Sequence, residues 1–223
     1  NLEGSGFVYG LAMAKGLIAG GVAGSVLLLT SSCTSGYIHP KDLAGRYLFG
    51  DGAAAALVTS AEQKRIFSFV YGSDGNRRTI FIPNGAFRNR YDFEAREVEY
   101  KPGSIATRNH MIADRDSFAE FAMEKVPAMV NAVLQKNDCA IGEVDHAVFH
   151  QADPSLLDSL ASRCSIPGEK FFNGISRTGN TGPSSIPIGI RTLMDEGRLI
   201  EGQRVLLAGY GAGGSLAATI IEI

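Results

Sequence analysis

Two side chains in the second half of the chain are of types that can act on a carbonyl group. His150 follows a short apolar run at residues 144–149, and Asn180 lies in a Gly-Asn-Thr turn ahead of a predicted helix. A histidine ring and an amide side chain can both donate hydrogen bonds to a carbonyl oxygen, which polarises a thioester or stabilises an enolate. For either residue alone, packing or turn chemistry is the more common explanation.

The opening segment, Asn1 to Phe7, has the form of a nucleophile turn without a nucleophile. It leads into residues 6–18, which are small or apolar almost all round with Lys15 as the only charge. This pattern predicts a helix buried on most of its faces. Taken with His150 and Asn180, the turn suggests an acyl-transfer site that lacks its sulfur.

Two other motifs admit different chemistry. Residues 209–214 satisfy G-x-G-x-x-G, but a strand-like run fills the last nine residues, where dinucleotide binding needs a helix and a later acidic residue. A tight turn with close backbone approach explains these glycines better. His146 and His150 are four residues apart, which on a strand separates them by about 13 Å. We therefore expect no nucleotide and no metal site.

Composition narrows the function classes. At 223 residues and 45% hydrophobic residues, the chain can bury a substantial core in one large domain or two small ones. A formal charge of -2 with interspersed acids and bases argues against nucleic acid or a membrane as partner. The apolar run at 17–30 is too short and glycine-rich to span a bilayer. Three cysteines without C-x-x-C spacing, Cys33, Cys139 and Cys164, favour a reducing compartment, so we expect a cytoplasmic protein.

The elements that would position these groups alternate between strands and helices. Strands are predicted at residues 25–30, 47–59, 66–71, 144–149, 204–208 and 215–221. Helices are predicted at residues 6–18, from a Ser117/Glu120 capping box through a kink or break at Pro127, from Asp153-Pro154 to Arg163, and at 181–196. Residues 72–110 are polar and irregular. This order favours a layered α/β domain.

An ordered set of motifs along essentially the whole chain resembles β-ketoacyl-acyl-carrier-protein synthase III, a family of thiolase-fold condensing enzymes. The set consists of Ser5-Gly6-Phe7, Phe49-Gly50-Asp51-Gly52-Ala53, His150-Gln151-Ala152, Gly179-Asn180-Thr181 with Ser184-Ser185-Ile186-Pro187, and Gly209-Tyr210-Gly211-Ala212-Gly213. The resemblance implies a thiolase-like layered α/β/α fold, mainly the C-terminal repeat plus the last elements of the N-terminal repeat. It places a remnant of the N-terminal half at 1–60 and the C-terminal half at 61–223, with an irregular insertion at 72–110.

The same resemblance implies a set of site residues. In the family a cysteine takes an acyl group from coenzyme A, malonyl-acyl-carrier protein is decarboxylated, and the carbanion attacks the acyl thioester. His150 and Asn180 match the family histidine and asparagine, and Gly4 matches the cysteine. Backbone amides of Gly4 and Ala212 fall where the family builds its oxyanion hole. The substrate-binding positions are matched by Phe7, Tyr210 and Gly211.

Gly4 sets the strongest limit on activity. Glycine cannot supply a thiolate, and none of the three cysteines lies in a comparable turn, so covalent acyl transfer by this chain is predicted to be absent. Family members also carry a further N-terminal half ahead of the turn. Asp153 replaces a family asparagine and adds a charge near the site.

Three interpretations therefore stay open. The chain is a cysteine-lacking form or fragment of a synthase, a non-catalytic partner of an active homologue, or a malonyl-thioester decarboxylase, a reaction that needs no nucleophile. The resemblance implies no cofactor beyond the coenzyme A thioester substrate, acyl carrier protein as a partner, and a homodimer or association with a homologue. Arginines in the irregular part are expected to be solvated loop charges rather than phosphate contacts; they are Arg77, Arg78, Arg88, Arg90 and Arg108.

Overall fold

The computed structural model describes residues 2–76, 79–85 and 89–223. Its main sheet has four strands in the order β3-β10-β9-β8. These strands are β3 (Val70–Ser73), β8 (His146–Phe149), β9 (Arg204–Gly211) and β10 (Ser215–Glu222). β8 and β9 are parallel, whereas β9 with β10 and β10 with β3 are antiparallel. The carboxyl ends of β8 and β9 consequently lie at the same edge of the sheet.

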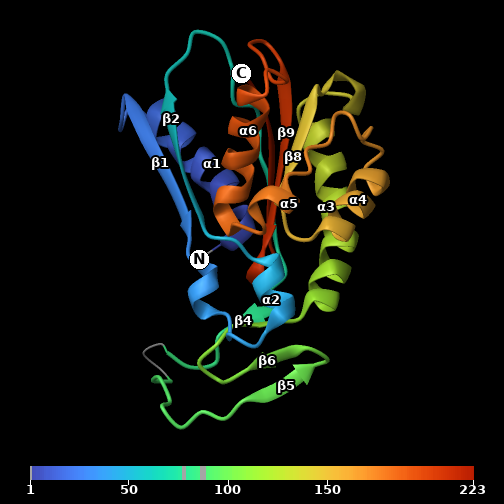
Figure 1. Ribbon diagram of the computed structural model, residues 1–223. Coiled ribbons are helices and arrows are strands. Elements are labelled where there is room, and N and C mark those ends of the chain that lie inside the picture. The colour runs from blue at the N-terminus through green and yellow to red at the C-terminus, as the bar shows by residue number, and fades with distance from the viewer. Residues whose placement is uncertain (1, 77–78, 86–88) are drawn as a thin grey trace.

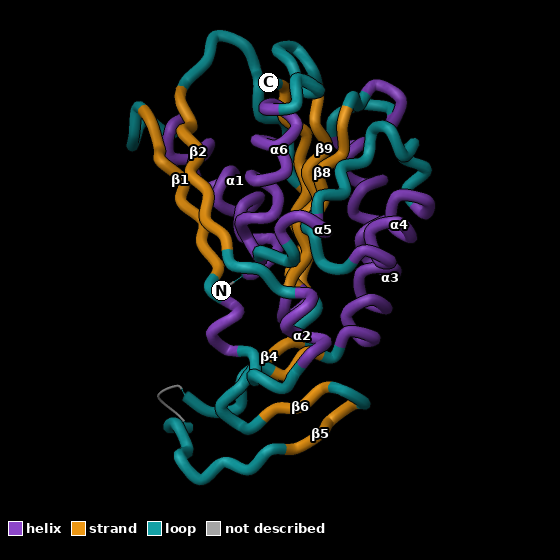
Figure 2. Tube along the Cα trace, viewed as in Figure 1, coloured by secondary structure: helices purple, strands orange, loops and turns teal. Residues whose placement is uncertain are grey.

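A second sheet and two pairs of helices complete a layered structure. The second sheet pairs β1 (Ser25–Ser32) with β2 (Gly52–Thr59) in antiparallel register. Helices α1 (Gly6–Ala19) and α6 (Ser185–Asp195) lie between the two sheets, and α3 (Arg115–Lys136) and α4 (Pro154–Arg163) cover the opposite face of the main sheet (Figure 1). Figure 2 shows the resulting succession of layers, strand, helix, strand and helix.

Shorter elements gather mainly at one end of the molecule. Strand pairs β4 (Ile80–Phe81) with β7 (Ile112–Ala113) and β5 (Val98–Lys101) with β6 (Ser104–Ala106) lie below the layers in Figure 1. Two short helices, α2 (Leu43–Leu48) and α5 (Ile175–Thr178), are connected to loops of the site. Single 3-10 turns occur at Glu3–Ser5, Thr34–Tyr37, Ile141–Glu143, Gly182–Ser184 and Ala212–Gly214.

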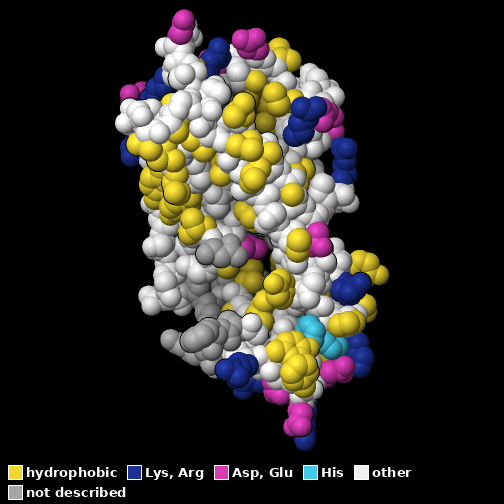
Figure 3. Space-filling view, turned by 90° about the vertical axis from the view of Figure 1, so that its left-hand side faces the viewer, with side chains coloured by type: hydrophobic (Ala, Val, Ile, Leu, Met, Phe, Trp, Pro, Cys, Tyr) yellow, Lys and Arg dark blue, Asp and Glu magenta, His cyan; other side chains and the backbone are white. Residues whose placement is uncertain are grey.

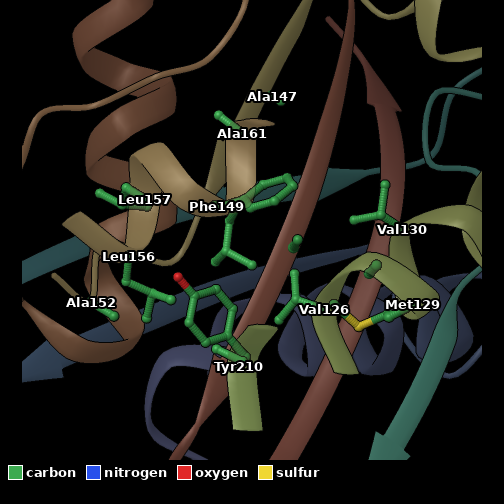
Figure 4. Packing of buried hydrophobic residues seen from close by; sticks show 14 of the residues in the cluster. Val126, Met129, Val130, Ala147, Phe149, Ala152, Leu156, Leu157, Ala161 and Tyr210 are labelled. Carbon is green, nitrogen blue, oxygen red and sulfur yellow. The ribbon is translucent and has the colours of Figure 1, made fainter. Parts of the chain in front are cut away.

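Two hydrophobic clusters hold the layers together, one on each face of the main sheet. Under α3 and α4, Phe121, Phe149 and Leu157 are fully buried. Figure 4 shows Phe149 and Leu157 within this cluster. On the other face, α1 and α6 pack Phe7 and Ile186 against the same strands. Strands covered on both faces are apolar without alternation, which explains the buried run along β9.

Most of the predicted elements are confirmed, including the apolar helix α1, the proline-started helix α4 and the terminal hairpin β9–β10. The predicted strand at 47–59 is wrong in its first part. Asp42 caps helix α2 by accepting a hydrogen bond from the Gly45 amide at 3.2 Å, so residues 43–48 are helical and β2 begins only at Gly52. The predicted strand at 66–71 is shorter than expected, because β3 begins at Val70.

Two expectations about α3, the capping box and a break at Pro127, are also wrong. The helix begins at Arg115, where Asp114 is the cap and accepts the Ser117 hydroxyl at 2.8 Å, so Ser117 and Glu120 do not form the capping box. Pro127 lies inside one continuous helix rather than dividing it. A proline removes one backbone hydrogen bond, and the buried contacts of α3 on the main sheet outweigh that loss.

Candidate active site

His150 lies immediately beyond β8, at the carboxyl end of a parallel strand, where α/β folds commonly place functional groups. Its amide donates to the carbonyl oxygen of Ala208 on β9 at 2.9 Å, and its Nδ1 lies 2.9 Å from the Ser185 hydroxyl oxygen. Tyr210 packs edge-on against the ring, with centroids 5.2 Å apart, and donates its hydroxyl to the His150 carbonyl oxygen. Burial lowers the pKa of His150 to about 3, partly opposed by the Gly182 backbone, so the ring is neutral at physiological pH.

Gly4 lies directly against this histidine. A Cβ atom built on Gly4 would be 2.3 Å from the carbonyl oxygen of Tyr210 and 2.4 Å from two ring carbons of His150. Contacts under 3.0 Å are essentially never made by real Cβ atoms. The space that a side chain at position 4 would need is therefore already filled by neighbouring atoms.

The amide of Gly4 is engaged by the preceding side chain. Gly4 donates its N–H to Oε2 of Glu3 at 3.1 Å, and Glu3 has a left-handed backbone with φ 48. Burial raises the pKa of the Glu3 carboxyl, and the Gly4 amide opposes that shift. Ala212, the other residue expected at an oxyanion hole, lines a cavity of about 880 Å³ together with Glu3. In this conformation the Gly4 amide is not offered to a ligand.

Asn180 is fixed by backbone contacts on both sides of its turn. Its amide donates to the Leu48 carbonyl at 2.8 Å, its Oδ1 accepts from the Gly182 amide at 2.9 Å, and its Nδ2 donates to the Ala152 carbonyl at 3.4 Å. Gly179 precedes it with φ 67 and packs on backbone atoms, so a side chain there would be strained and crowded.

Two chains of hydrogen bonds connect Asn180 to His150. The amide of Ala152 donates to the His150 carbonyl oxygen, and the Ala152 carbonyl accepts from Asn180. A second path runs through Gly182 and Ser185, because Ser185 donates to the Gly182 carbonyl and contacts the His150 ring. Residues that follow β8 and α5 thus meet the start of α6 at one place.

A cavity of about 480 Å³ reaches this place from the surface. Its walls include the apolar side chains of Leu48, Phe49 and Phe118, and Asn180 and Ala152 also line it. Among the described residues, its lining contains neither His150 nor Gly4. A ligand in this cavity would meet Asn180 first.

The negative charge of Asp153, which lines this cavity, is balanced by an ion pair with Arg115. Asp153 caps α4 through the Ser155 amide at 3.0 Å and forms an ion pair with Arg115 of α3. Burial tends to raise the pKa of this carboxyl, but the hydrogen bonds from Ser155 and Arg115 outweigh it, so the pKa lies below its usual value. The extra charge expected near the site is therefore compensated.

The remaining predicted site residues, Tyr210, Gly211 and Phe7, differ in how close they lie to His150 and Gly4. Tyr210 contacts His150, and Gly211 packs closely on the Gly4 amide, where a Cβ would come within 2.8 Å of the nitrogen. Phe7 is a core residue of α1, 3% exposed, and lines neither of the two cavities described above. Its position favours packing over substrate contact.

The cysteines and the loop arginines differ in their exposure to solvent. Cys33 is exposed and lines the larger cavity, whereas burial raises the pKa of the half-buried Cys164 to about 11. Arg90 and Arg108 are exposed loop residues. Outside the described residues lie three of the arginines considered above, Arg77, Arg78 and Arg88.

Sequence reasoning missed two residues that contact the site. Ser185 was part of a recognised motif, but nothing in its type indicated that it contacts a histidine 35 positions away. Glu3 was visible as an acidic residue next to Gly4, but its burial, which would have marked it as a site residue, is seen only in the structure.

The described residues also limit other kinds of site. None of their helices is both long and apolar enough to cross a bilayer. Within the same part of the chain, no group of three or more His, Cys, Asp and Glu side chains is arranged to hold a metal ion.

The layers and the glycine-rich end of β9, which packs against the turn ahead of α1, define a thiolase-like α/β fold. A crystal structure of a 3-oxoacyl-(acyl-carrier-protein) synthase III matches the chain with a TM-score of 0.96 and 36% identity, covering 100% of this chain and 67% of that one. The synthase III from Pseudomonas aeruginosa PAO1 matches with a TM-score of 0.86 and 27% identity, over 99% of this chain and 65% of that chain.

Sequence comparison agrees with the structural match. Residues 1–75 match the family described as 3-oxoacyl-[acyl-carrier-protein (ACP)] synthase III, and residues 134–223 match its C-terminal part. β-Ketoacyl-[acyl-carrier-protein] synthase III of Trichodesmium erythraeum is 32% identical over 219 residues, which are 98% of this chain and 65% of that protein. The chain thus spans slightly less than two thirds of the curated relatives it matches. It belongs to the β-ketoacyl-acyl-carrier-protein synthase III family.

Proposed function

We propose that the protein carrying this chain binds acyl thioesters of coenzyme A or acyl carrier protein, and that this chain does not itself accept the acyl group. The family reaction is the decarboxylative Claisen condensation of an acyl-coenzyme A with malonyl-acyl-carrier protein. The observation that carries the proposal is the closed space at Gly4, where a side chain would meet Tyr210 and His150 at 2.3 to 2.4 Å. Without a thiolate, no acyl-enzyme forms at this position.

Thioester binding is supported by the cavity that ends at Asn180. Its volume of about 480 Å³ lies in the range of small-molecule sites, and its walls combine apolar side chains with charged and polar ones. Lys101 and Arg115 lie near its mouth beside Asp116, and each makes an ion pair with an aspartate. An amide side chain at the inner end suits a carbonyl oxygen.

Filling this cavity should abolish thioester binding. Ala119 lines it from α3, so Ala119→Trp is expected to lower the affinity for acyl-coenzyme A by at least tenfold through steric exclusion. Glu120→Trp puts the same side chain at an exposed neighbour outside the lining and should leave the affinity unchanged. Isothermal titration measures both. Equal affinities in the two variants would contradict the proposal that acyl thioesters bind in this cavity.

A non-catalytic partner role is the second candidate, and an exposed apolar sheet face favours it. Leu27, Leu29 and Leu57 on the outer side of β1 and β2 are 60%, 67% and 68% exposed. Leu27 lies directly opposite Leu57 in the pairing register. Figure 3 shows hydrophobic side chains gathered on this side of the molecule. A contiguous apolar face of this kind marks an interaction surface.

Charging this face should suppress association. The pair Leu27→Lys with Leu57→Glu keeps an attractive cross-strand contact while removing apolar area. We expect it to weaken complexes made through this face by more than tenfold in light scattering. Ser25→Glu with Thr59→Lys alters an opposed polar pair on the same face and should have a much smaller effect. Unchanged association in the leucine variant would argue against this surface.

Location and domain division belong to the same proposal. A cytoplasmic site of action is supported by three free cysteines. A division into an N-terminal and a C-terminal portion is supported by the separate family matches at 1–75 and 134–223, of which the first runs past the proposed boundary near residue 60.

A further inference from the structure

The larger cavity, of about 880 Å³, lies beside Gly4, and we call it the polar cavity. Glu3, whose side chain binds the Gly4 amide, and Ala212 both line it. Cys33, Tyr37 and Tyr91 line the same cavity and are exposed, the two tyrosines at 55% each. The polar cavity therefore extends from the protein surface to the neighbours of Gly4, and its volume lies in the range of small-molecule sites.

Most of the described side chains that line the polar cavity carry a hydrogen-bonding group. Among them, the hydroxyl oxygens of Ser32 and Thr34 are 2.7 Å apart. Two hydroxyls have two protons, and the hydrogen bond between them uses only one, so the pair keeps one proton to donate and lone pairs that accept. A purely apolar ligand would take water away from this pair without replacing its hydrogen bonds, which is costly.

The other walls of the polar cavity combine a histidine with apolar side chains. Nδ1 of His110 lies 2.8 Å from the Thr107 hydroxyl oxygen, so Nε2 is the ring nitrogen that a ligand can contact. Ile80, Phe81 and Met111 supply apolar surface. The cavity therefore suits a molecule that is apolar along part of its length and carries hydrogen-bonding groups elsewhere.

Ile80 of β4 connects the polar cavity to the cavity that ends at Asn180. Among the described residues, it is the only one that lines both cavities. A thioester has two ends, the acyl group and the carrier arm. With the arm in the cavity at Asn180, the acyl group extends past Ile80 into the polar cavity. This placement of the two ends rests on the proposed function.

We propose that the polar cavity binds acyl chains that carry hydroxyl groups in preference to unsubstituted chains, and that Thr34 is a specificity-determining residue for this choice. A ligand hydroxyl gives the Ser32–Thr34 pair a partner in place of water, whereas an alkyl chain of the same length gives it none. A site built to hydrogen-bond a hydroxyl rejects the analogue that lacks it for this reason. The preference belongs to the cavity itself and does not require that the chain be presented as a thioester.

The test is ¹H–¹³C NMR of the intact protein labelled at its methionine methyl groups, because Met111 lines the polar cavity and Met123 lines the cavity at Asn180. Met111→Leu and Met123→Leu assign the two signals. The probes are two uncharged amides of equal chain length, octanamide and 3,5-dihydroxyoctanamide. We expect the dihydroxy amide to shift the Met111 signal, to leave the Met123 signal unchanged, and to bind at least fivefold more tightly than octanamide.

Two results would overturn the proposal. One is that octanamide binds as tightly as the dihydroxy amide, and the other is that the dihydroxy amide leaves the Met111 signal in place. Because neither probe is a thioester, both results are independent of whether the chain binds acyl-coenzyme A. Loss of the proposed function would instead appear as an absence of acyl-coenzyme A binding while the dihydroxy amide still shifts Met111.

Two threonine variants test the role of Thr34. Thr34→Val keeps the shape of the side chain but removes its hydroxyl, and should weaken binding of the dihydroxy amide about fivefold without weakening that of octanamide. Thr59→Val makes the same change at an exposed residue of β2 that lines neither cavity, and should leave both affinities unchanged. Undiminished binding of the dihydroxy amide by Thr34→Val would contradict the role of Thr34. If Thr34→Val does not fold, the comparison of the two amides on the unmodified protein still decides.

Discussion

Gly4→Cys is expected to destabilise the fold and to leave the chain without an acyl-enzyme. The introduced Cβ meets a backbone oxygen of central strand β9 at 2.3 Å and the His150 ring at 2.4 Å. The strand is held by pairing on both sides and the ring by Ser185, so neither shifts freely. Overpacking of a filled core generally costs about 1 to 3 kcal/mol, and thermal unfolding should occur several degrees lower.

Matched variants separate crowding from sulfur chemistry. Gly4→Ala introduces the same Cβ without a thiol and should destabilise by a similar amount. Gly16→Ala lies in the neighbouring helix α1, where a Cβ meets nothing within 4 Å, and should be neutral or stabilising. A Gly4→Cys protein with unaltered stability, acylated by acyl-coenzyme A at the introduced thiol, would show that the space beside Gly4 opens and would contradict this expectation.

Acid sensitivity between pH 6.5 and 4.5 is the second large expected effect, and His150 is its cause. The folded state lowers the pKa of His150 from 6.5 to about 3. The unfolded state therefore binds the proton first as the pH falls, so stability is present above pH 6.5 and is lost toward pH 3. At about 1.4 kcal/mol per pH unit for one proton, roughly 2 kcal/mol should be lost across this window.

A variant comparison isolates this contribution. His150→Gln removes the titrating group, so its unfolding free energy should fall less steeply with acid in urea titrations at each pH. His110, whose pKa burial also lowers, contributes a slope of the same sign in both proteins. Glu3, with its raised pKa, acts in the opposite direction in both. Parallel pH profiles for the two proteins would contradict a neutral buried His150.

Periodicity and caps predicted much of this fold. Helix α1 follows from its small and apolar residues, and α4 follows from Asp153 and Pro154 at its start. The error at α3 came from choosing Ser117 as the cap, because any of several polar residues near a helix start can cap it. Asp114 is favoured in the structure, where its carboxylate also binds Lys101 from a distant strand. Such long-range contacts leave no local pattern.

The site, like the fold, could be predicted only in part from the sequence. His150 and Asn180 were found through motifs, and both lie in the same site. The closure over Gly4 could not be predicted, because it depends on where the Tyr210 carbonyl and the His150 ring come to rest in space. The hydroxyl of Ser185 and the carboxyl of Glu3 act through three-dimensional neighbours that sequence spacing does not reveal.

The most direct measurement of the central claim is a labelling experiment on the intact protein. After incubation with isotope-labelled acyl-coenzyme A, rapid quenching and proteolysis, mass spectrometry maps any acyl group on the chain. The closed space at Gly4 predicts no acyl group on the peptide containing residues 2–15, and the exposed Cys33 should also be unmodified although it lines the neighbouring cavity. A stable acyl group on either peptide, in an amount that rises with the amount of protein, would contradict the proposal that this chain does not accept the acyl group.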